Sequence, residues 1–267
     1  LGLTGFGNAF LQTGDTSYVD VWGEMIDIIN SNGKEEDGRM LYPHMYGDEG
    51  WYAYSGSPYS YGAREIYYWT LREEDRKRQG DGWWTFLEGR KPRYPEQVLR
   101  GDLGWVQSRV EAMRRDPTTP QTRLSDDPMI YNPVAVGHLV QLMLGGLPPG
   151  VPLIAGPLHC RVRYFDPARR RAGIPEDVAA LVEALSADGM ALRLVNTNQV
   201  EAREVVVQGG AYGEHQFLDA AIGGGTTTVD GPFFTVRLAP GAGVRLELGM
   251  QRYANQPTFT FPWDRKE

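Results

Sequence analysis

The spacing of apolar residues changes from a helical to a strand period near residue 147, and this change limits the fold more than any other feature. In "TGDTSYVDVWGEMIDIIN", apolar residues from Val19 to Ile29 recur at steps of three or four, as on one face of a helix. In "MALRLVNTN", apolar residues alternate with others from Met190 to Leu194, as in a half-buried strand. One chain therefore holds both kinds of structure, in succession.

We expect an α+β protein of two domains. The composition shift "LPPGVP" at residues 147–152 marks the boundary between them. Residues 1–147 are predicted to form a helical-hairpin domain. Residues 152–267 are predicted to form an antiparallel β-sandwich with one helix, "IPEDVAALVEAL", at about residues 175–186.

Helix boundary signals recur in the first domain. A turn is expected at Gly14, and further helices are expected at residues 58–74 and in "GDLGWVQSRVEAMRRD". In "YNPVAVGHLVQLMLGG", Asn132 is a candidate cap, Pro133 the first helical residue and Gly145 the stop. No strand alternation is visible between these helices, so long loops are predicted to join them.

Strand signals dominate the second domain. "REVVVQ" is a β-branched run, and "FFTVRLAPGAGVRLELGM" reads as two alternating strands around a Gly/Pro turn. In those two strands, Val236, Leu238, Leu246 and Leu248 are expected to face inward while Arg237 and Arg245 face water. Cys160 is expected to be buried and inert.

Charge and cysteine content exclude several function classes. The formal net charge of −7, without a long basic run, argues against nucleic acid as a partner. A single cysteine and scattered histidines predict no metal site, and we expect no cofactor. No apolar stretch is long enough to span a bilayer, so no membrane partner is expected. The chain opens at Leu1 on helical spacing, which suggests a fragment or processed chain. An extracellular or periplasmic location would follow if an export signal precedes it.

Aromatic rings are concentrated between residues 42 and 69. The stretch "YPHMYGDEGWYAYSGSPYSYGAREIYYW" holds more than half of the chain's 14 tyrosines and contains four glycines, too many for one helix. Tryptophan and tyrosine rings pack on the C–H faces of sugars, while carboxylates and phenols bind sugar hydroxyls. The stretch therefore predicts either a sugar-binding wall or core packing around a tight loop.

The helical part resembles the (α/α) toroid carbohydrate-active enzymes, the six-hairpin glycoside hydrolases and related polysaccharide lyases. The resemblance rests on "NAFLQTGDTSYVDVWGEMID", in which a helix ends at T-G-D and the next begins with Tyr and carries Trp. It implies a partial toroid of about three hairpins, followed by an accessory β-sandwich. A second chain that supplies the remaining helical hairpins is a candidate partner, beside an oligo- or polysaccharide. The resemblance also implies a cleft on loops at one end of the helix ring.

Candidate site residues come from the ring-rich stretch. Glu49, Asp48 and His44 are the candidate catalytic residues, with Glu49 as the general acid of a glycosidase. Asp48 and Glu49 are adjacent and point in different directions, so the second carboxylate of an acid/base pair must come from elsewhere. The candidate substrate-binding residues are Trp51, Tyr52, Tyr54, Tyr59 and Arg64.

Three functions remain open at this point. Glycoside hydrolysis needs two carboxyl groups at a defined separation. A polysaccharide lyase needs a base such as His44 or a tyrosine, with Arg64 neutralising a uronate. A non-catalytic scaffold or binding subunit would use the rings for packing, and Tyr67, Tyr68 and Trp69 in particular suit a helix core.

Overall fold

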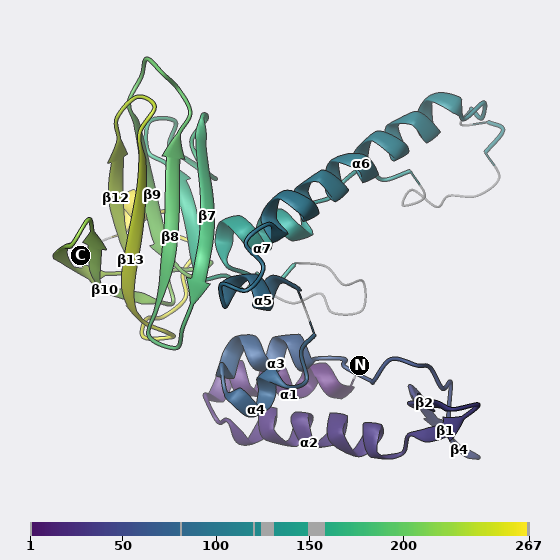
Figure 1. Cartoon of the computed structure of the whole chain (residues 1–267). Coiled ribbons are helices and arrows are strands. Elements are labelled where there is room, and N and C mark those ends of the chain that lie inside the picture. Colours follow the sequence, from purple (N-terminus) through teal and green to yellow (C-terminus); the bar gives the residue numbers. More distant parts are fainter. Residues whose placement is uncertain (1, 81, 120, 124–130, 149–157, 266–267) are drawn as a thin grey trace. The chain divides into compact units, whose positions relative to one another are not determined.

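The computed structural model describes residues 2–80, 82–119, 121–123, 131–148 and 158–265 (Figure 1). Helices occupy most of the N-terminal half and antiparallel sheets the C-terminal half, as the change of period predicts. The chain divides into two compact units, one before and one after residue 81. This boundary at residue 81 differs from the one that the sequence predicted at residues 147–152. Residues 149–152 lie outside the described part.

The first unit begins with a helical hairpin. Helix α1 (Gly2–Thr13) ends at Gly14, whose positive φ of 72° and N–H bond to the Phe10 carbonyl close the helix. Helix α2 (Ser17–Ser31) follows after a turn in which the Asp15 carboxylate accepts from the Ser17 N–H at 2.9 Å. Helices α3 (Ala63–Thr70) and α4 (Glu73–Arg76) complete the helical part, so the helix predicted for residues 58–74 is shorter and broken.

Two short β-hairpins lie between α2 and α3, where the expectation of strand-free loops was wrong. One pairs β1 (Lys34–Glu36) with β2 (Arg39–Leu41), and the other pairs β3 (Met45–Gly47) with β4 (Gly50–Tyr52). The first turn consists of Asp37 and Gly38, both at positive φ, which matches the right-handed twist of paired strands. Three-residue strands are too short to show alternation, so their pairing depends on these turns.

The core of the first unit is a row of aromatic rings. The ring centres of Trp22 in α2 and Trp69 in α3 are 6.4 Å apart, and the ring centre of Phe10 in α1 lies 5.7 Å from that of Trp69. Tyr61 extends the row, 6.5 Å from Trp22. Aromatic side chains bury large apolar areas, so these contacts help to join α1, α2 and α3.

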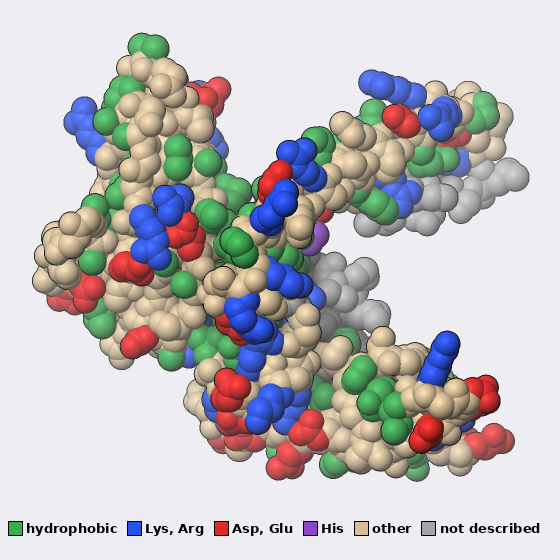
Figure 2. Space-filling view, viewed as in Figure 1, with side chains coloured by type: hydrophobic (Ala, Val, Ile, Leu, Met, Phe, Trp, Pro, Cys, Tyr) green, Lys and Arg blue, Asp and Glu red, His purple; other side chains and the backbone are tan. Residues whose placement is uncertain are grey.

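The second unit begins with helices rather than strands. These are α5 (Gly82–Leu87), α6 (Tyr94–Arg115) and α7 (Gly137–Leu144). Gly145 ends α7 at positive φ, as expected, but the helix begins at Gly137 rather than at Pro133. Figure 2 shows both hydrophobic and basic side chains along α6. Helices α5 and α7 pack against strand β7 and so join the sheets.

Two antiparallel sheets make up the rest of the second unit (Figure 1). One sheet has the order β11-β10-β13-β8-β7 and the other has the order β12-β9-β5-β6. The strands of the first sheet are β7 (Val178–Leu185), β8 (Gly189–Asn196), β10 (Gln216–Ile222), β11 (Gly225–Gly231) and β13 (Gly243–Gln251). Those of the second sheet are β5 (Val162–Asp166), β6 (Arg171–Ala172), β9 (Arg203–Gly209) and β12 (Phe233–Leu238), and a short 3-10 helix spans Pro262–Asp264.

The prediction of a helix at about residues 175–186 was wrong. Residues Val178–Leu185 form strand β7, paired with β8 along almost its whole length. Alanine, leucine and glutamate favour a helix locally, but a free edge of the sheet offers these residues a full hydrogen-bonded ladder. A register shift between Val182 and Ala184 also hides the strand period in the sequence.

Side chains from both sheets make the core of this unit. Leu192, Leu194, Leu246 and Leu248 are buried on one sheet, and Val205 and Val207 on the other. Phe217 of β10 and Phe234 of β12 meet edge to face with ring centres 5.0 Å apart. Leu238 is buried while Arg237 and Arg245 are exposed, as the alternation predicts. The two strands around the Gly/Pro turn nevertheless belong to different sheets.

Candidate functional site

The β3–β4 hairpin presents aromatic rings on both of its faces. Tyr46 is directly opposite Trp51, and Met45 is directly opposite Tyr52. Opposite residues share a face, so the first pair lies on one face of the ribbon and the second pair on the other. Tyr46 and Tyr52 are 68% and 51% exposed. The ring-rich stretch is therefore not interior filling at this point.

The Tyr46 and Trp51 rings hold one another in place. Their centres are 4.8 Å apart, and the planes meet at 68°, an edge-to-face contact. Trp51 is half-buried as a result, while Tyr46 keeps most of its ring in solvent. The register of the two short strands thus positions this pair of rings, Tyr46 and Trp51, which we call the ring surface.

Asp48 and Glu49 form the two-residue turn between β3 and β4. Both side chains are exposed, and Gly50 after them adopts a φ of 97° that favours glycine. Both residues therefore lie within three positions of Tyr46 or Trp51 along the chain. The structure leaves the side chain of the candidate acid Glu49 exposed to solvent.

His44 holds the loop that follows the hairpin. Its Nε2 lies 2.9 Å from the Ser55 hydroxyl and 3.0 Å from the Ser57 carbonyl. Its ring also packs edge-on against Tyr59 at 5.6 Å. These contacts give the imidazole a structural role in the loop. They also occupy the Nε2 atom that a catalytic base would use.

Tyr54 and Tyr59 are half-buried, unlike the exposed Tyr46 and Tyr52 of the hairpin. The Tyr54 hydroxyl donates to the Asn32 carbonyl at 3.4 Å, and the Lys34 ammonium lies 4.5 Å from the ring centre. The backbone of Tyr59 is bound by the Asn30 side chain, which accepts from its N–H at 2.8 Å and donates to its carbonyl at 2.9 Å. Burial raises the pKa of Tyr59.

The remaining predicted residues lie on helix α3. Arg64 is half-buried in the first turn of the helix rather than in the hairpin. Tyr68 and Trp69 are buried in the core, which agrees with the interpretation of these two rings as core packing. The ring-rich stretch thus divides into an exposed hairpin and a buried helix.

Tyr46 is a member of the ring surface that the sequence analysis did not select. The signal was present, because "YGDEGW" places a two-residue turn between two glycines and so sets Tyr46 opposite Trp51. Without the register of β3 and β4, nothing distinguished Tyr46 from the other tyrosines of the stretch. Its exposure and its contact with Trp51 make it the strongest candidate for ligand contact.

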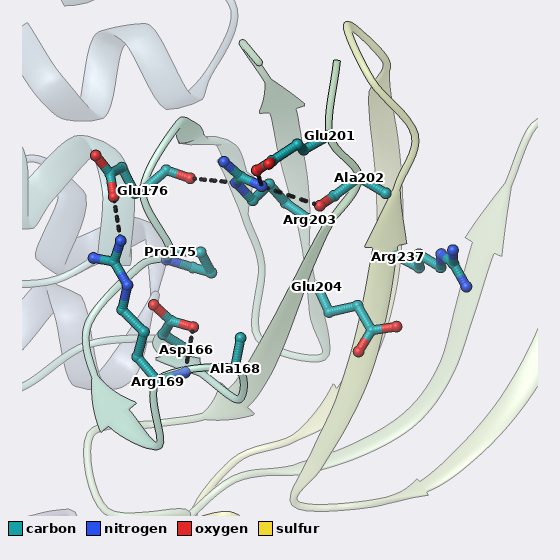
Figure 3. Close-up of a pocket in the computed structure, with 10 residues that line it drawn as sticks. All are labelled: Asp166, Ala168, Arg169, Pro175, Glu176, Glu201, Ala202, Arg203, Glu204 and Arg237. Carbon is teal, nitrogen blue, oxygen red and sulfur yellow. Dashed lines mark hydrogen bonds and ion pairs between the residues drawn. The ribbon is translucent and has the colours of Figure 1, made fainter. Parts of the chain in front are cut away.

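The second unit holds a charged pocket of about 410 Å³ (Figure 3). It lies at one end of the four-stranded sheet, between the turn after β5, the segment before β7 and the start of β9. Its charged lining residues are Asp166, Arg169, Glu176, Glu201, Arg203, Glu204 and Arg237. No aromatic ring lines it, so it offers polar contacts but no stacking surface for a sugar.

Ion pairs within the protein occupy two arginines of this pocket. Arg169 pairs with Glu176, and Arg203 pairs with Glu201 at 2.6 Å and with Asp177 at 2.9 Å. The Asn198 amide and Arg203 hydrogen-bond to Asp177 and hold the pKa of its carboxyl below the usual range. Two of the positive charges that would attract an anion are therefore already neutralised.

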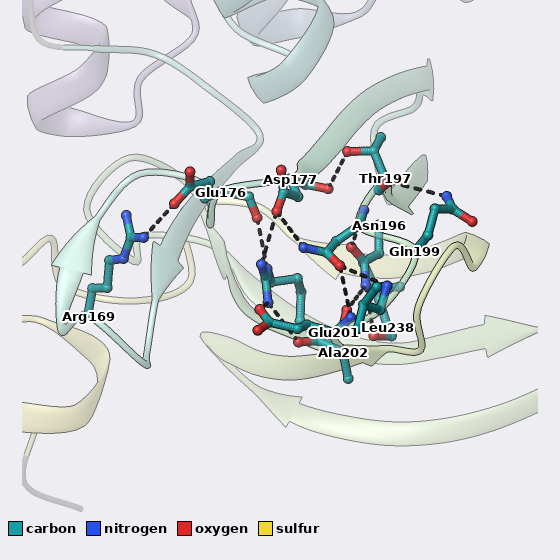
Figure 4. A network of polar contacts seen from close by, with 12 residues as sticks. Arg169, Glu176, Asp177, Asn196, Thr197, Gln199, Glu201, Ala202 and Leu238 are labelled. Carbon is teal, nitrogen blue, oxygen red and sulfur yellow. Dashed lines mark hydrogen bonds and ion pairs between the residues drawn. The ribbon is translucent and has the colours of Figure 1, made fainter.

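A buried asparagine holds the adjacent loop (Figure 4). The Asn196 amide donates to the carbonyls of Glu201 and Ala239 at 2.8 and 3.1 Å. Its Oδ1 accepts from the Asn198 N–H at 3.0 Å. This network connects the end of β8 to the segments that precede β9 and follow β12.

Buried titratable groups gather at the other end of the sheets. Burial lowers the pKa of His159 to about 4 and that of His215 to about 3, and it raises the pKa of the Cys160 thiol. Cys160 is buried, as expected. Among the described residues, no group of three or more His, Cys, Asp or Glu side chains is placed to hold a metal ion.

Comparison with known proteins gives one match. The family described as a domain of unknown function, DUF8034, matches residues 65–140, from α3 through α6 into α7. Its description names no activity. No curated protein and no solved structure matches the chain. Within the described residues, no helix combines the length and apolar character that a membrane crossing needs.

Proposed function

We propose that this protein binds an oligo- or polysaccharide over the exposed rings of the β3–β4 hairpin, as part of a carbohydrate-active protein. The observation that supports the proposal is the pair of exposed tyrosines, Tyr46 and Tyr52, on a ribbon whose turn carries two carboxylates. Exposed rings stack on the apolar faces of a pyranose, and carboxylates accept hydrogen bonds from its hydroxyls.

The finer fold assignment belongs to the same proposal. The α1–α2 hairpin would be one hairpin of a partial (α/α) toroid, and the two sheets with Phe217 and Phe234 between them would be the accessory β-sandwich. A second chain with further hairpins would complete the toroid.

A binding assay tests the proposal directly. Native gels that contain a neutral glucan, a galactan or a uronate polymer should retard the wild-type chain in at least one case. Tyr46→Ala should weaken binding to that polymer about tenfold, equivalent to about 1.4 kcal/mol. Tyr18→Ala, at an exposed tyrosine on α2, is the matched control and should leave the retardation unchanged. If no polymer retards the wild type, or if both variants bind equally, the proposal is wrong.

Glycoside hydrolysis is the enzymatic form of this proposal, favoured by the position of Glu49 in the turn that joins the two ring-bearing strands. Glu49→Gln keeps the shape of the side chain and removes its proton. It should abolish the release of reducing ends while leaving polymer retardation intact. An unsaturated, ultraviolet-absorbing product would indicate elimination instead. If the wild type binds without any turnover, the protein is a non-catalytic binding subunit.

A further inference from the structure

The net charge of the chain is concentrated in its N-terminal part. Residues 1–81 contain 7 Lys and Arg and 14 Asp and Glu, which gives the formal charge of −7 that the whole chain has. The rest of the chain holds 20 basic and 20 acidic residues and is formally neutral. Figure 2 shows acidic side chains in the region of the two short hairpins. The field of the first unit therefore attracts cationic ligands and repels anionic ones.

The turn between β3 and β4 contributes two of these negative charges without a compensating cation. The sequence has no Lys or Arg at residues 40–63. Among the described residues, neither Asp48 nor Glu49 has an ion-pair partner. In the other hairpin, the Lys34 ammonium is already paired with Glu36 at 3.1 Å. The charge of the β3–β4 turn is therefore available to a ligand.

This turn is close enough to the ring surface to act on a ligand there. Consecutive Cα atoms are about 3.8 Å apart, so the Cα atoms of Asp48 and Tyr46 are separated by at most about 7.6 Å. The same limit holds for Glu49 and Trp51. Electrostatic attraction extends over about 10 Å at 0.1 M salt. A charged group on a sugar that stacks on the rings is thus attracted or repelled by the turn.

Three classes of polysaccharide can be compared on this basis. A uronate polymer carries carboxylates that the turn repels. Arg64, which was expected to neutralise a uronate, lies on α3 rather than in the hairpin. A neutral polymer stacks on the rings but makes no use of the two charges. A polymer with free amines stacks in the same way and places ammonium groups near the carboxylates.

We propose that the sugar bound by the ring surface is a polymer of amino sugars whose amines are free and protonated. The inference rests on the proposed function and deepens it by naming the class of sugar. Tyr46 and Trp51 supply the stacking contact that any pyranose can make. Asp48 and Glu49 supply the preference for the cationic sugar.

Binding of two matched oligosaccharides to the full chain tests the inference. Hexamers of glucosamine and of N-acetylglucosamine share backbone and linkage, but only the first carries charge in a mildly acidic buffer. In low salt, titration calorimetry should show at least about fivefold tighter binding of the glucosamine hexamer, and high salt should reduce this preference. Equal or tighter binding of the acetylated hexamer, or a preference that salt does not change, refutes this inference alone. If neither hexamer nor any polymer of the gel assay binds, the proposed function fails as well.

Variants of the turn and of the rings separate charge from stacking. Asp48→Asn combined with Glu49→Gln should remove the preference while leaving the affinity for the acetylated hexamer unchanged. Glu24→Gln combined with Glu73→Gln removes the same charge from exposed positions on α2 and α4 and should retain the preference. An equal loss in both double variants would refute the role of the turn. Tyr46→Ala should weaken binding of both hexamers. If it leaves the glucosamine hexamer unaffected, charge alone holds the ligand, as it would hold a basic peptide, and the inference is wrong.

Discussion

The backbone N–H of Tyr253 donates a hydrogen bond of 3.1 Å to Nδ1 of His215. The His215 side chain is 2% exposed, and its ring meets the Tyr253 ring edge to face at 4.8 Å. Nδ1 can accept this bond only while it carries no proton. Folding therefore selects the neutral imidazole of His215, which directly precedes β10.

Stability is expected to fall as the pH falls from about 6.5 towards 3. Burial, followed by the charges of Arg161 and Arg252, lowers the pKa of His215 to about 3. In this window the unfolded chain binds a proton that the folded chain does not bind. The free energy of unfolding should therefore fall by about 1.4 kcal/mol per pH unit through this residue. Above the unfolded pKa of about 6.5 this contribution is complete and constant.

His215→Asn separates this effect from other titrations, including that of Glu214, whose pKa burial raises. The asparagine keeps an acceptor near Nδ1 and cannot titrate. Urea unfolding at several pH values should give a shallower slope for His215→Asn than for the wild type. Tyr253→Phe keeps the histidine and should retain the full slope. Equal slopes for the asparagine variant and the wild type would show that His215 does not titrate in this way.

Gly62→Ala is expected to destabilise the first unit by about 3 kcal/mol or more. Gly62 adopts a φ of 86°, and a Cβ there would lie 1.9 Å from Cζ2 of Trp22. The indole has little room to move, because it packs against Trp69 and Tyr61. Thermal unfolding followed by tryptophan fluorescence measures the loss. Gly56→Ala, with nothing within 4 Å of the added carbon, should change the transition little; a similar loss in both variants would contradict the steric argument.

Asp75→Asn should cost about 2–4 kcal/mol of stability. The Asp75 carboxylate is 2% exposed and accepts from Arg72 at 2.8 Å and from Arg78 at 2.6 Å. These arginines also pair with Asp20 and Asp27, so Asp75 links α4 to α2. An amide cannot balance two guanidinium charges, although partial exposure of the arginines reduces the cost. Glu74→Gln, at an exposed pair, is the control in the same denaturation series, and an equal effect of both changes would disprove the link.

Asn30→Ala is expected to release the loop before α3. The Asn30 amide forms both hydrogen bonds that bind the backbone of Tyr59 to α2. Hydrogen exchange at the Tyr59 amide should become at least about tenfold faster, since its acceptor is lost. Ser31→Ala, whose hydroxyl bonds within α2, should leave that amide protected. Unchanged exchange in Asn30→Ala would mean that other contacts hold the loop.

Local patterns in the sequence determined much of the secondary structure. The helix-stop signals at Gly14 and Gly145 predict the ends of α1 and α7, because glycine accepts the left-handed conformation that ends a helix. The Asp37–Gly38 pair also carries a hairpin signal, but three-residue strands give no period to read. Alternation around Arg237 and Arg245 predicts which side chains face water, since each neighbour along a strand points to the opposite face.

Tertiary structure decided the rest. The sequence alone specified where rings, carboxylates and apolar stripes occur along the chain. It did not specify that Val178–Leu185 joins a sheet, because a strand gains its ladder from a partner that local preference does not reveal. It also did not single out the exposed Tyr46 among the tyrosines, since exposure depends on which elements pack over a residue. Register and packing, which join residues distant in the chain, made both distinctions.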